Sequence, residues 1–445
     1  MSKVRWIRTR GHKRPAALAL ALCLLACFAQ TAAGSQAHIA AVAPPLGGVD
    51  IDGLTSGSTP AQADQSIALA SSLRAKIVRV ELPWSVLEPS GPGQLDARAL
   101  AYTDRLFADA AARDIRIIVM LDSSPCWATS APESVQRSCV PGRRSEANGY
   151  PPSQPSDFAA FATTLVERYK GQIDALEVWN EPDQANEKYF AGPEKPQRYA
   201  ALLRATYPLV KAADPAVNVL AGSLVGFNGV FLRLLYEAGI KGYYDGLAVH
   251  YYTLTLAAIR SIRAVQLANG DSKPLWLDEF GWSDCYPRLK VQEEQACVSA
   301  AVQAKNITNI YRSLSTTGYM QAITLYQLQD GDGDSFGVAS AQGARKPAFS
   351  ALASVLSSPI GPVSPVTLSL RRVGSGIVAS GEGPVGDYMH MEIFKNGVLR
   401  YKVLFTLNSF NRYSFKLPRA IGTRAVRVRV FQQWSGSRRA AQRTI

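Results

Sequence analysis

The sequence predicts an α/β fold in which a (β/α)8 TIM barrel is followed by a small all-β domain of the sandwich type. Two observations support the barrel: eight short apolar runs read as strands, and each is followed by a longer amphipathic stretch. The third observation marks the second domain. After the turn-forming segment 357–362, the helical stretches give way to short alternating strands.

The eight strand–helix pairs fit one barrel with inserted loops. Strands are expected at 46–51, 77–82, 115–122, 175–180, 217–222, 246–252, 275–280 and 320–327. Helices are expected at 62–75, 96–113, 155–169, 196–213, 230–239, 254–268, 293–316 and 346–356. A doubly wound open sheet would also alternate strands with helices. It usually carries a glycine-rich phosphate loop after its first strand, and Gly47-Gly48-Val49-Asp50 is not one.

The second domain is expected to hold strands at 366–370, 376–380, 388–395, 398–407, 413–417 and 425–432. Asn396-Gly397 is a hairpin signal between two of them. We therefore place the barrel domain at 34–358 and the sandwich-like accessory domain at 364–445.

Residues 1–33 have the features of an export signal peptide. Six Lys or Arg and no acid precede an apolar run at 16–28, which is shorter than the ~20 residues that span a bilayer. Cleavage after Ala33 would give a secreted, extracellular protein. An alternative is a lipoprotein anchored at Cys27, because Leu24-Leu25-Ala26-Cys27 resembles a bacterial lipobox. An uncleaved anchor is the third option.

The formal net charge of +13 is distributed unevenly. Residues 361–445 contain 14 Lys or Arg and 3 Asp or Glu, a net +11, whereas 34–360 are mildly acidic. In an exported protein, such a domain is expected to attract an anionic glycan or a membrane surface rather than nucleic acid. The alternative is a solvated basic surface without a specific partner.

Two glutamates mark a candidate active site. Glu181 follows the fourth predicted strand in Asn180-Glu181-Pro182, and Glu279 closes the seventh in Asp278-Glu279-Phe280-Gly281-Trp282. Both lie at the carboxyl end of a strand, where barrel active sites are built. The two strand ends can face one another across the mouth, and paired carboxyl groups can serve as proton donor and nucleophile.

These motifs resemble clan A of the glycoside hydrolases, nearest to families 5 and 39. Asn180-Glu181-Pro182 resembles the clan's acid/base motif, and the segment around Glu279 resembles its nucleophile motif. His250-Tyr251-Tyr252 resembles the His-x-Tyr element, and Arg79 on the second strand resembles the clan's strand-two arginine. Asn-Glu-Pro alone is a weak pattern. The four matches occur in order, each on a predicted strand or at its end, and they cover essentially the whole barrel.

The resemblance implies a retaining mechanism with Glu181 as acid/base and Glu279 as nucleophile. It implies that Asn180 bonds the sugar 2-hydroxyl, that Tyr252 holds Glu279, that Arg79 keeps Glu279 ionised, and that His250 binds substrate or orients the site. From the proximity of Glu279, we expect the pKa of Glu181 to be raised. Trp282 and Trp127 are expected to stack on sugar rings, with core packing as the alternative.

Four cysteines lie beyond the signal, an even number that indicates disulfides in an exported chain. Of the three possible pairings, we expect Cys126–Cys139 and Cys285–Cys297. Both pairs lie in loops on the face that carries the candidate site, and a cross-pair would obstruct the cleft. Their spacing does not resemble a zinc site, so neither a metal nor a cofactor is predicted.

The expected function is therefore an exported retaining glycoside hydrolase that cleaves O-glycosidic bonds of a polysaccharide or glycoside. One alternative is a non-catalytic carbohydrate- or cell-wall-binding protein on a barrel scaffold. Another is a transglycosylase, which would use the same residues. The sequence specifies neither the sugar nor the oligomeric state.

Overall fold

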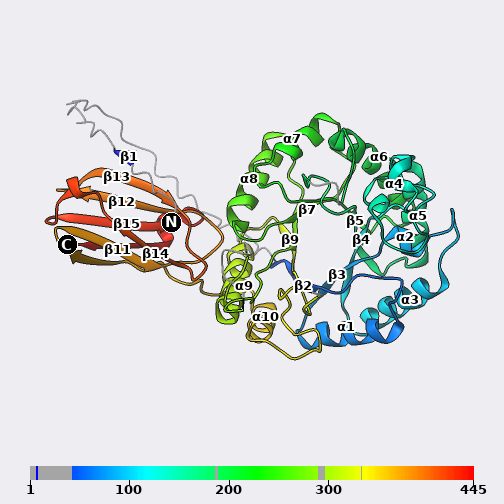
Figure 1. The fold of residues 1–445 in the computed structure, drawn as a ribbon, viewed down its shortest axis with the longest axis horizontal. Coiled ribbons are helices and arrows are strands. Elements are labelled where there is room, and N and C mark those ends of the chain that lie inside the picture. The colour runs from blue at the N-terminus through cyan, green and yellow to red at the C-terminus, as the bar shows by residue number, and fades with distance from the viewer. Residues whose placement is uncertain (1–6, 9–42, 186–188, 289–295, 332) are drawn as a thin grey trace, which may run out of the picture.

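The computed structural model describes residues 7–8, 43–185, 189–288, 296–331 and 333–445 (Figure 1). The expected signal 1–33, including Cys27 and the cleavage site at Ala33, lies outside the described residues apart from β1 (Ile7–Arg8). Among the helices of the described part, none has the length and apolar character needed to cross a membrane.

The predicted barrel is confirmed: eight parallel strands close into a ring when β2 pairs with β9. The strands are β2 (Leu46–Asp50), β3 (Ile77–Glu81), β4 (Arg116–Leu121), β5 (Ile173–Val178), β6 (Asn218–Leu224), β7 (Gly246–His250), β8 (Leu275–Glu279) and β9 (Met320–Leu325). Figure 1 shows the helices surrounding them. The longer helices are α1 (Pro60–Ser72), α3 (Ala97–Ala112), α5 (Pro155–Arg168), α6 (Lys195–Ala213), α7 (Val230–Glu237), α8 (Thr255–Ala268), α9 (Ala300–Leu314) and α10 (Pro347–Ser357).

Two details of the helices differ from the prediction. α9 begins at Ala300 instead of 293, because the Ser299 hydroxyl caps the first turn by accepting from the Val302 N–H, and Cys297 is held in a bridge with Ser283. Residues 293–295 of the expected helix lie outside the described part. The short helices were not predicted, since three or four residues are too few to show a period; they are α2 (Trp84–Leu87), α4 (Glu133–Gln136), η1 (Glu146–Gly149), η2 (Arg419–Ile421) and η3 (Gly436–Arg439).

The interior of the barrel changes from apolar to charged toward the carboxyl ends of the strands. Alternate residues of a barrel strand point inward. The lower inward positions form a buried apolar layer of Ile77, Ile118, Ala175, Leu220, Ala248, Trp276 and Ala322. Two residues further along four of these strands, the inward positions are Arg79, Glu177, His250 and Asp278. The period-two pattern of the sequence thus places a charged layer directly on the apolar core.

The C-terminal domain is all-β, as predicted. One sheet has the order β10-β11-β14, with β10 (Ser369–Val373), β11 (Gly376–Glu382) and β14 (Arg412–Lys416). The other has the order β1-β13-β12-β15-β16, with β12 (Met389–Lys395), β13 (Val398–Phe405), β15 (Val426–Gln432) and β16 (Ala440–Thr444). β12 and β15 alternate buried apolar with less buried residues. β16 was not predicted, because this exposed edge strand has no apolar alternation.

The C-terminal domain docks on the barrel beside α8 and α9 (Figure 1). Arg260 on α8 makes a two-pronged ion pair with the buried carboxylate of Asp387, at 2.6 and 3.0 Å. The Gly386 carbonyl accepts hydrogen bonds from the backbone N–H groups of Leu256 and Ala257, at 2.9 and 3.2 Å. These N–H groups lie in the first turn of α8 and have no partner within the helix. The second domain therefore caps a barrel helix.

Candidate active site

Arg79 on β3 is the centre of a buried ionic cluster at the barrel mouth. Its Nε donates to Glu177 Oε2 at 2.7 Å, and its Nη1 donates to Asp50 Oδ2 at 3.1 Å and to Glu279 Oε1 at 2.8 Å. Its Nη2 donates to Asn180 Oδ1 at 3.1 Å. Because the Asn180 oxygen is engaged in this way, its NH2 group is the part available to a ligand.

The two expected catalytic glutamates meet at one histidine. His250 Nδ1 lies 2.9 Å from Glu181 Oε1 and 3.3 Å from Glu279 Oε2. One carboxylate oxygen of Glu181 and one of Glu279 lie within 4.8 Å of each other. The Tyr252 hydroxyl donates to Glu279 Oε2 at 2.6 Å, and Gln184 Nε2 donates to Glu181 Oε2 at 2.6 Å. The structure thus brings together six of the eight residues expected to catalyse or bind: Arg79, Asn180, Glu181, His250, Tyr252 and Glu279.

An irregular backbone presents Asn180 and Glu181 to the mouth. Trp179 and Glu181 both have left-handed backbone angles, with φ of 72° and 45°. Such angles cost non-glycine residues roughly 1–3 kcal/mol each and persist where the surroundings enforce them. Here the Trp179 ring is fully buried, and the Trp179 backbone N–H donates to Leu121 O at 2.8 Å. That anchor turns the chain after β5 so that the next residues face the cleft.

His250 carries the positive charge between the two glutamates. Burial lowers the pKa of His250, but the nearby Glu279 carboxylate and the hydrogen bond to Glu181 outweigh burial and raise that pKa to about 10. Burial raises the pKa of Glu181, but the hydrogen bond and charge of His250 outweigh burial and leave that pKa below its ordinary value. The expectation that Glu279 would raise the pKa of Glu181 is therefore wrong, because His250 lies 2.9 Å from Glu181 and its hydrogen bond and positive charge lower that pKa.

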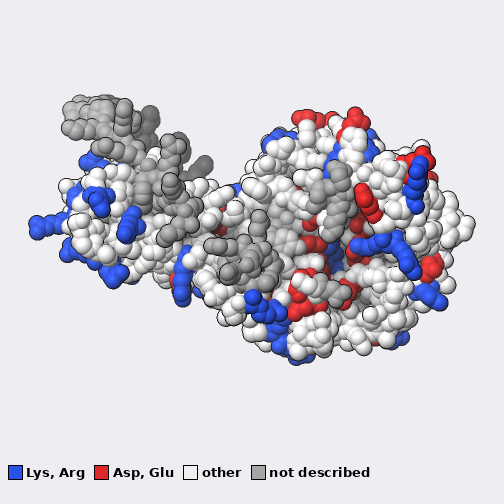
Figure 2. Space-filling model, in the orientation of Figure 1, with Lys and Arg blue, Asp and Glu red and all other residues white. Residues whose placement is uncertain are grey.

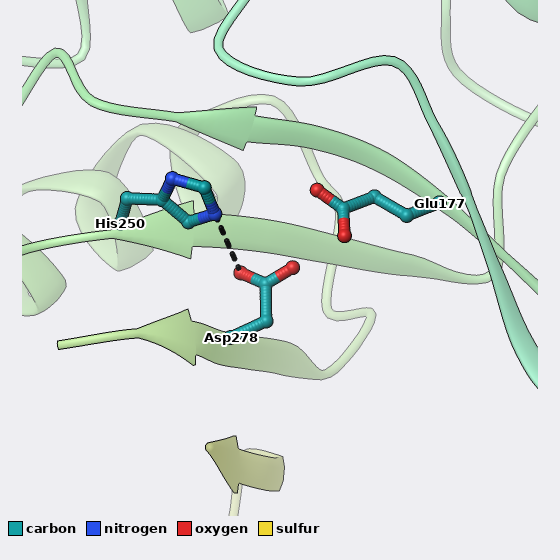
Figure 3. Close-up of side chains that lie close together, drawn as sticks. All are labelled: Glu177, His250 and Asp278. Atoms are coloured by element: carbon teal, nitrogen blue, oxygen red, sulfur yellow. Dashed lines mark ion pairs between the residues drawn. The ribbon is translucent and has the colours of Figure 1, made fainter. Parts of the chain in front are cut away.

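Beneath the two glutamates lies a second set of buried ionisable groups. Figure 3 shows Glu177, His250 and Asp278 pointing toward one another from three barrel strands, with an ion pair of 3.7 Å between His250 Nε2 and Asp278 Oδ1. Burial raises the pKa of Asp278 well above its ordinary value, and the charge of Glu177 adds to the increase. Burial likewise raises the pKa of Glu177, but Arg79 outweighs burial and holds it below its ordinary value.

Two three-residue groups in the described part have the composition of metal sites: Glu177 with His250 and Asp278, and Glu181 with His250 and Glu279. The Arg79 guanidinium reaches both groups, with Nε 2.7 Å from Glu177 and Nη1 2.8 Å from Glu279. A fixed cation is thus already in contact with carboxylates of both groups. Ion pairing with Arg79 and His250 therefore accounts for the clustering of these acidic residues.

Two adjoining pockets open above the cluster. A polar pocket of about 470 Å³ contains Arg79, Asn180, Glu181, Tyr252 and Glu279 in its lining. A second pocket of about 430 Å³ shares Glu181 and Tyr252 but not Glu279. Figure 2 shows Asp and Glu gathered around the hollow at the centre of the barrel. Both volumes lie in the range of small-molecule sites.

The two tryptophans expected to stack on sugar do not line either pocket. Trp282 is 3% exposed and faces the junction with the C-terminal domain. Trp127 is half-buried; its Nε1 donates to the Glu88 carbonyl at 3.0 Å and its ring packs edge-on against Trp84. The aromatic side chains that do line the two pockets are Tyr189, Phe227, Tyr251, Tyr252, Tyr326 and Phe336.

Sequence reasoning also missed polar residues of the cleft. Arg144, from the long loop after β4, lines the polar pocket and forms an ion pair with Glu81. No sequence signal joins these residues, which are 63 positions apart. Glu177 and Asp278 could have been found, because each lies two residues after an inward apolar residue of its strand.

The cysteines pair locally, as expected. Cys126 bonds to Cys139 and Cys285 bonds to Cys297, with Cα–Cα distances of 5.7 and 5.4 Å. Both disulfides lie in loops at the carboxyl end of the barrel, after β4 and after β8. Two disulfides are consistent with an extracellular protein.

Comparison with known proteins supports the resemblance seen in the motifs. Residues 153–339 match the family model described as the glycosyl hydrolase catalytic core. A 6-phospho-beta-galactosidase from Lacticaseibacillus casei (strain BL23) is 26% identical over 168 residues, which is 37% of this chain and 32% of the relative. The chain thus spans about a third of the length of the curated relatives it matches.

Solved structures show the same fold. A GH39 enzyme from Xanthomonas axonopodis pv. citri aligns with a TM-score of 0.53 at 17% identity, covering 85% of this chain and 93% of that one. A monomeric beta-xylosidase from Caulobacter crescentus CB15 aligns with a TM-score of 0.52 at 18% identity, covering 79% and 84%. These structures show the barrel fold, and the family model over residues 153–339 supports the resemblance to glycoside hydrolases.

Proposed function

We propose that this chain, whose barrel is similar to the clan A glycoside hydrolases, is an exported retaining glycoside hydrolase with Glu279 as nucleophile and Glu181 as acid/base. The observation that carries the proposal is the distance of at most 4.8 Å between an oxygen of each carboxylate. Retaining enzymes hold their carboxyl groups about 5–5.5 Å apart, whereas inverting enzymes leave about 6.5–9.5 Å for a water molecule.

The first step is attack of Glu279 on the anomeric carbon. Arg79 and Tyr252 donate to different oxygens of Glu279, which fixes the orientation of the carboxylate. A bond forms between a Glu279 oxygen and the anomeric carbon as the bond to the leaving oxygen breaks. The Asn180 NH2 group is placed to donate to a sugar hydroxyl, because its carbonyl oxygen is held by Arg79.

The proton for the leaving oxygen comes from the His250–Glu181 pair. Its resting form has the proton on His250, 2.9 Å from Glu181. Attack consumes the charge of Glu279, which is one of the causes of the raised pKa of His250. The proton then moves to Glu181 and on to the leaving group. In the second step Glu181 takes a proton from a water molecule whose oxygen attacks the anomeric carbon. The bond to Glu279 breaks as the new bond forms, and the product retains the configuration of the substrate.

Replacing each glutamate tests these roles separately. Glu279→Ala should abolish turnover, and azide should restore it with formation of a glycosyl azide of inverted configuration. Glu181→Ala should retain the first step on aryl glycosides that have good leaving groups.

Product anomers should be read by proton NMR early in the reaction. An inverted first product, or near-normal rates on a natural glycan in both variants, would show that the assignment is wrong. Release of no sugar by the wild type would favour a non-catalytic binding protein, and sugar transfer instead of hydrolysis would favour a transglycosylase.

The second part of the proposal concerns export and surface attachment. The disulfides and the signal-like residues 1–33 support secretion, with lipid attachment at Cys27 as the alternative route.

Figure 2 shows Lys and Arg over the visible face of the C-terminal domain, in line with its net charge of +11. Binding to heparin or to vesicles with anionic lipids should fall steeply between 50 and 500 mM salt, since screening shortens the reach of surface charge to about 3–10 Å in the 0.1–1 M range. Salt-independent binding or none would contradict an electrostatic role.

A further inference from the structure

The two pockets of the cleft can be assigned to the two sides of the scissile bond. In the proposed reaction the nucleophile touches the sugar that becomes bound to the enzyme, whereas the acid lies between that sugar and the leaving group. Glu279 lines the polar pocket only, and Glu181 lines both pockets. The sugar that is attacked therefore occupies the polar pocket, and the leaving group occupies the pocket on the other side of Glu181.

The leaving-group pocket has an apolar floor and a polar edge. Val225, Phe227, Leu254 and Phe336 provide its apolar surface, while His250 and Tyr252 lie beside Glu181. Phe227 is 56% exposed. An exposed ring beside polar groups is the surface on which the apolar face of a pyranose stacks.

This pocket shares two lining residues with a cavity at the junction with the C-terminal domain. Thr253 and Leu254 line it, and the same two residues line a separate cavity of about 250 Å³ between the barrel and the second domain. The far side of that cavity is formed by Thr406, Ser409 and Asn411, after β13. The Asn411 side chain is fixed by a hydrogen bond of 2.8 Å to Asn306 of the barrel.

We infer that the leaving-group side of the cleft binds a glycan chain of at least two sugars, which runs from Glu181 past residues 251–254 onto the C-terminal domain. The inference rests on the proposed function, because it uses the roles of Glu181 and Glu279. The natural leaving group is then an oligosaccharide or a polysaccharide segment. The C-terminal domain then takes part in substrate recognition.

The first test compares two substrates of the same glycone sugar. A glycosyl fluoride leaves the second pocket empty, whereas a β-linked tetrasaccharide fills it. Phe227→Ala removes a stacking contact of about 0.5–1.5 kcal/mol, so kcat/KM on the tetrasaccharide should fall about 2- to 13-fold more than on the fluoride. Leu267→Ala is the matched control, since Leu267 is also 56% exposed and lies on α8 away from both pockets.

The second test blocks the interdomain cavity. Thr406→Trp should lower kcat/KM on the tetrasaccharide more than on a β-linked disaccharide of the same glycone sugar. Leu404→Trp, two residues earlier in the sequence, should not. Equal losses on long and short substrates for both Phe227→Ala and Thr406→Trp would overturn the inference while leaving the proposed function intact. Failure of the wild type to hydrolyse even the fluoride would instead contradict the proposed function.

Discussion

At the scale of single residues, the mouth of the barrel holds more carboxyl groups than positive charges. Five carboxyl groups, those of Asp50, Glu177, Glu181, Asp278 and Glu279, surround Arg79 and His250. If all of them were ionised, the buried site would carry three uncompensated negative charges, which is costly in a dry interior. Burial accordingly raises the pKa values of Asp50 and Asp278 well above their ordinary values.

Asp278 offers a test of this distribution of protons. Its pKa is raised in the folded protein from an ordinary value of 3.8, so the folded state keeps a proton that the unfolded chain loses. The contribution of Asp278 to the free energy of unfolding is therefore fully present below pH 3.8. It is lost as the pH rises toward the raised pKa of Asp278 in the folded protein. Asp278→Asn mimics the protonated acid and removes this loss. The melting temperature of Asp278→Asn relative to wild type should therefore rise as the pH is raised from 4 to 8.

Calorimetry at several pH values measures this difference, and the exposed Asp114→Asn serves as the control. A difference between Asp278→Asn and wild type that stays constant or becomes negative as the pH rises would show that Asp278 is ionised in the folded protein. Activity near neutral pH should survive in Asp278→Asn, because the amide can still donate toward Glu177 and accept from the Val249 N–H.

His250 governs the pH range of the proposed reaction. His250 and Glu181 share one proton, and this proton is lost only when the pH reaches the pKa of His250, about 10. The kcat/KM of the wild type should therefore stay constant up to high pH. His250→Asn leaves the proton on Glu181 alone, and the basic limb of the pH profile should then move down by several units. His390→Asn, in the C-terminal domain, is the control. Identical basic limbs for His250→Asn and wild type would exclude a shared proton.

At the scale of elements, strands were easier to predict from the sequence than loops. The barrel strands are short and mostly apolar runs, so their positions could be predicted. Strand ends alone predicted that Glu181 and Glu279 would face one another. The resemblance to clan A implied that Arg79 and His250 would join them. Trp282 lies beyond a strand end, where the direction of the loop decides what the ring contacts. Nothing local in the sequence encodes that direction, and the ring packs at the domain junction instead.

The loop after β4 is tied by Cys126–Cys139, and its continuation places Arg144 beside the cleft. Closing a loop of 13 residues stabilises by roughly 3 kcal/mol in the chain-entropy model. The double variant Cys126→Ser/Cys139→Ser should therefore lose about that much stability in urea unfolding. It should also raise KM, because Arg144 lines the polar pocket.

The control for this double variant is reduced wild type, which loses both disulfides and should be at least as destabilised as the variant. A variant with unchanged unfolding midpoint and unchanged KM would show that the loop is held by its packing alone, for example by the hydrogen bond from Gln136 Nε2 to the Cys126 carbonyl.

At the scale of the whole molecule, the two domains share a helix terminus. The Gly386 carbonyl caps α8, and α8 begins directly after residues 251–254, which line the leaving-group pocket. Gly386 has φ of 99°, and a Cβ atom there would lie 2.3 Å from Ile310 Cδ1 and 3.1 Å from Leu256 Cγ. Gly386→Ala therefore cannot keep both its backbone angle and its contact with the barrel.

We expect wild type to unfold in a single calorimetric transition, because docking satisfies buried polar groups of both domains. Gly386→Ala should lower the melting temperature or split the transition into two, and it should reduce turnover by displacing residues 251–254. Gly376→Ala is the matched control: its φ is not in the left-handed region, and its nearest neighbour is the Val373 oxygen at 3.8 Å. Two transitions already present in wild type, or a Gly386→Ala variant indistinguishable from wild type, would mean that the barrel folds and holds its cleft without the C-terminal domain.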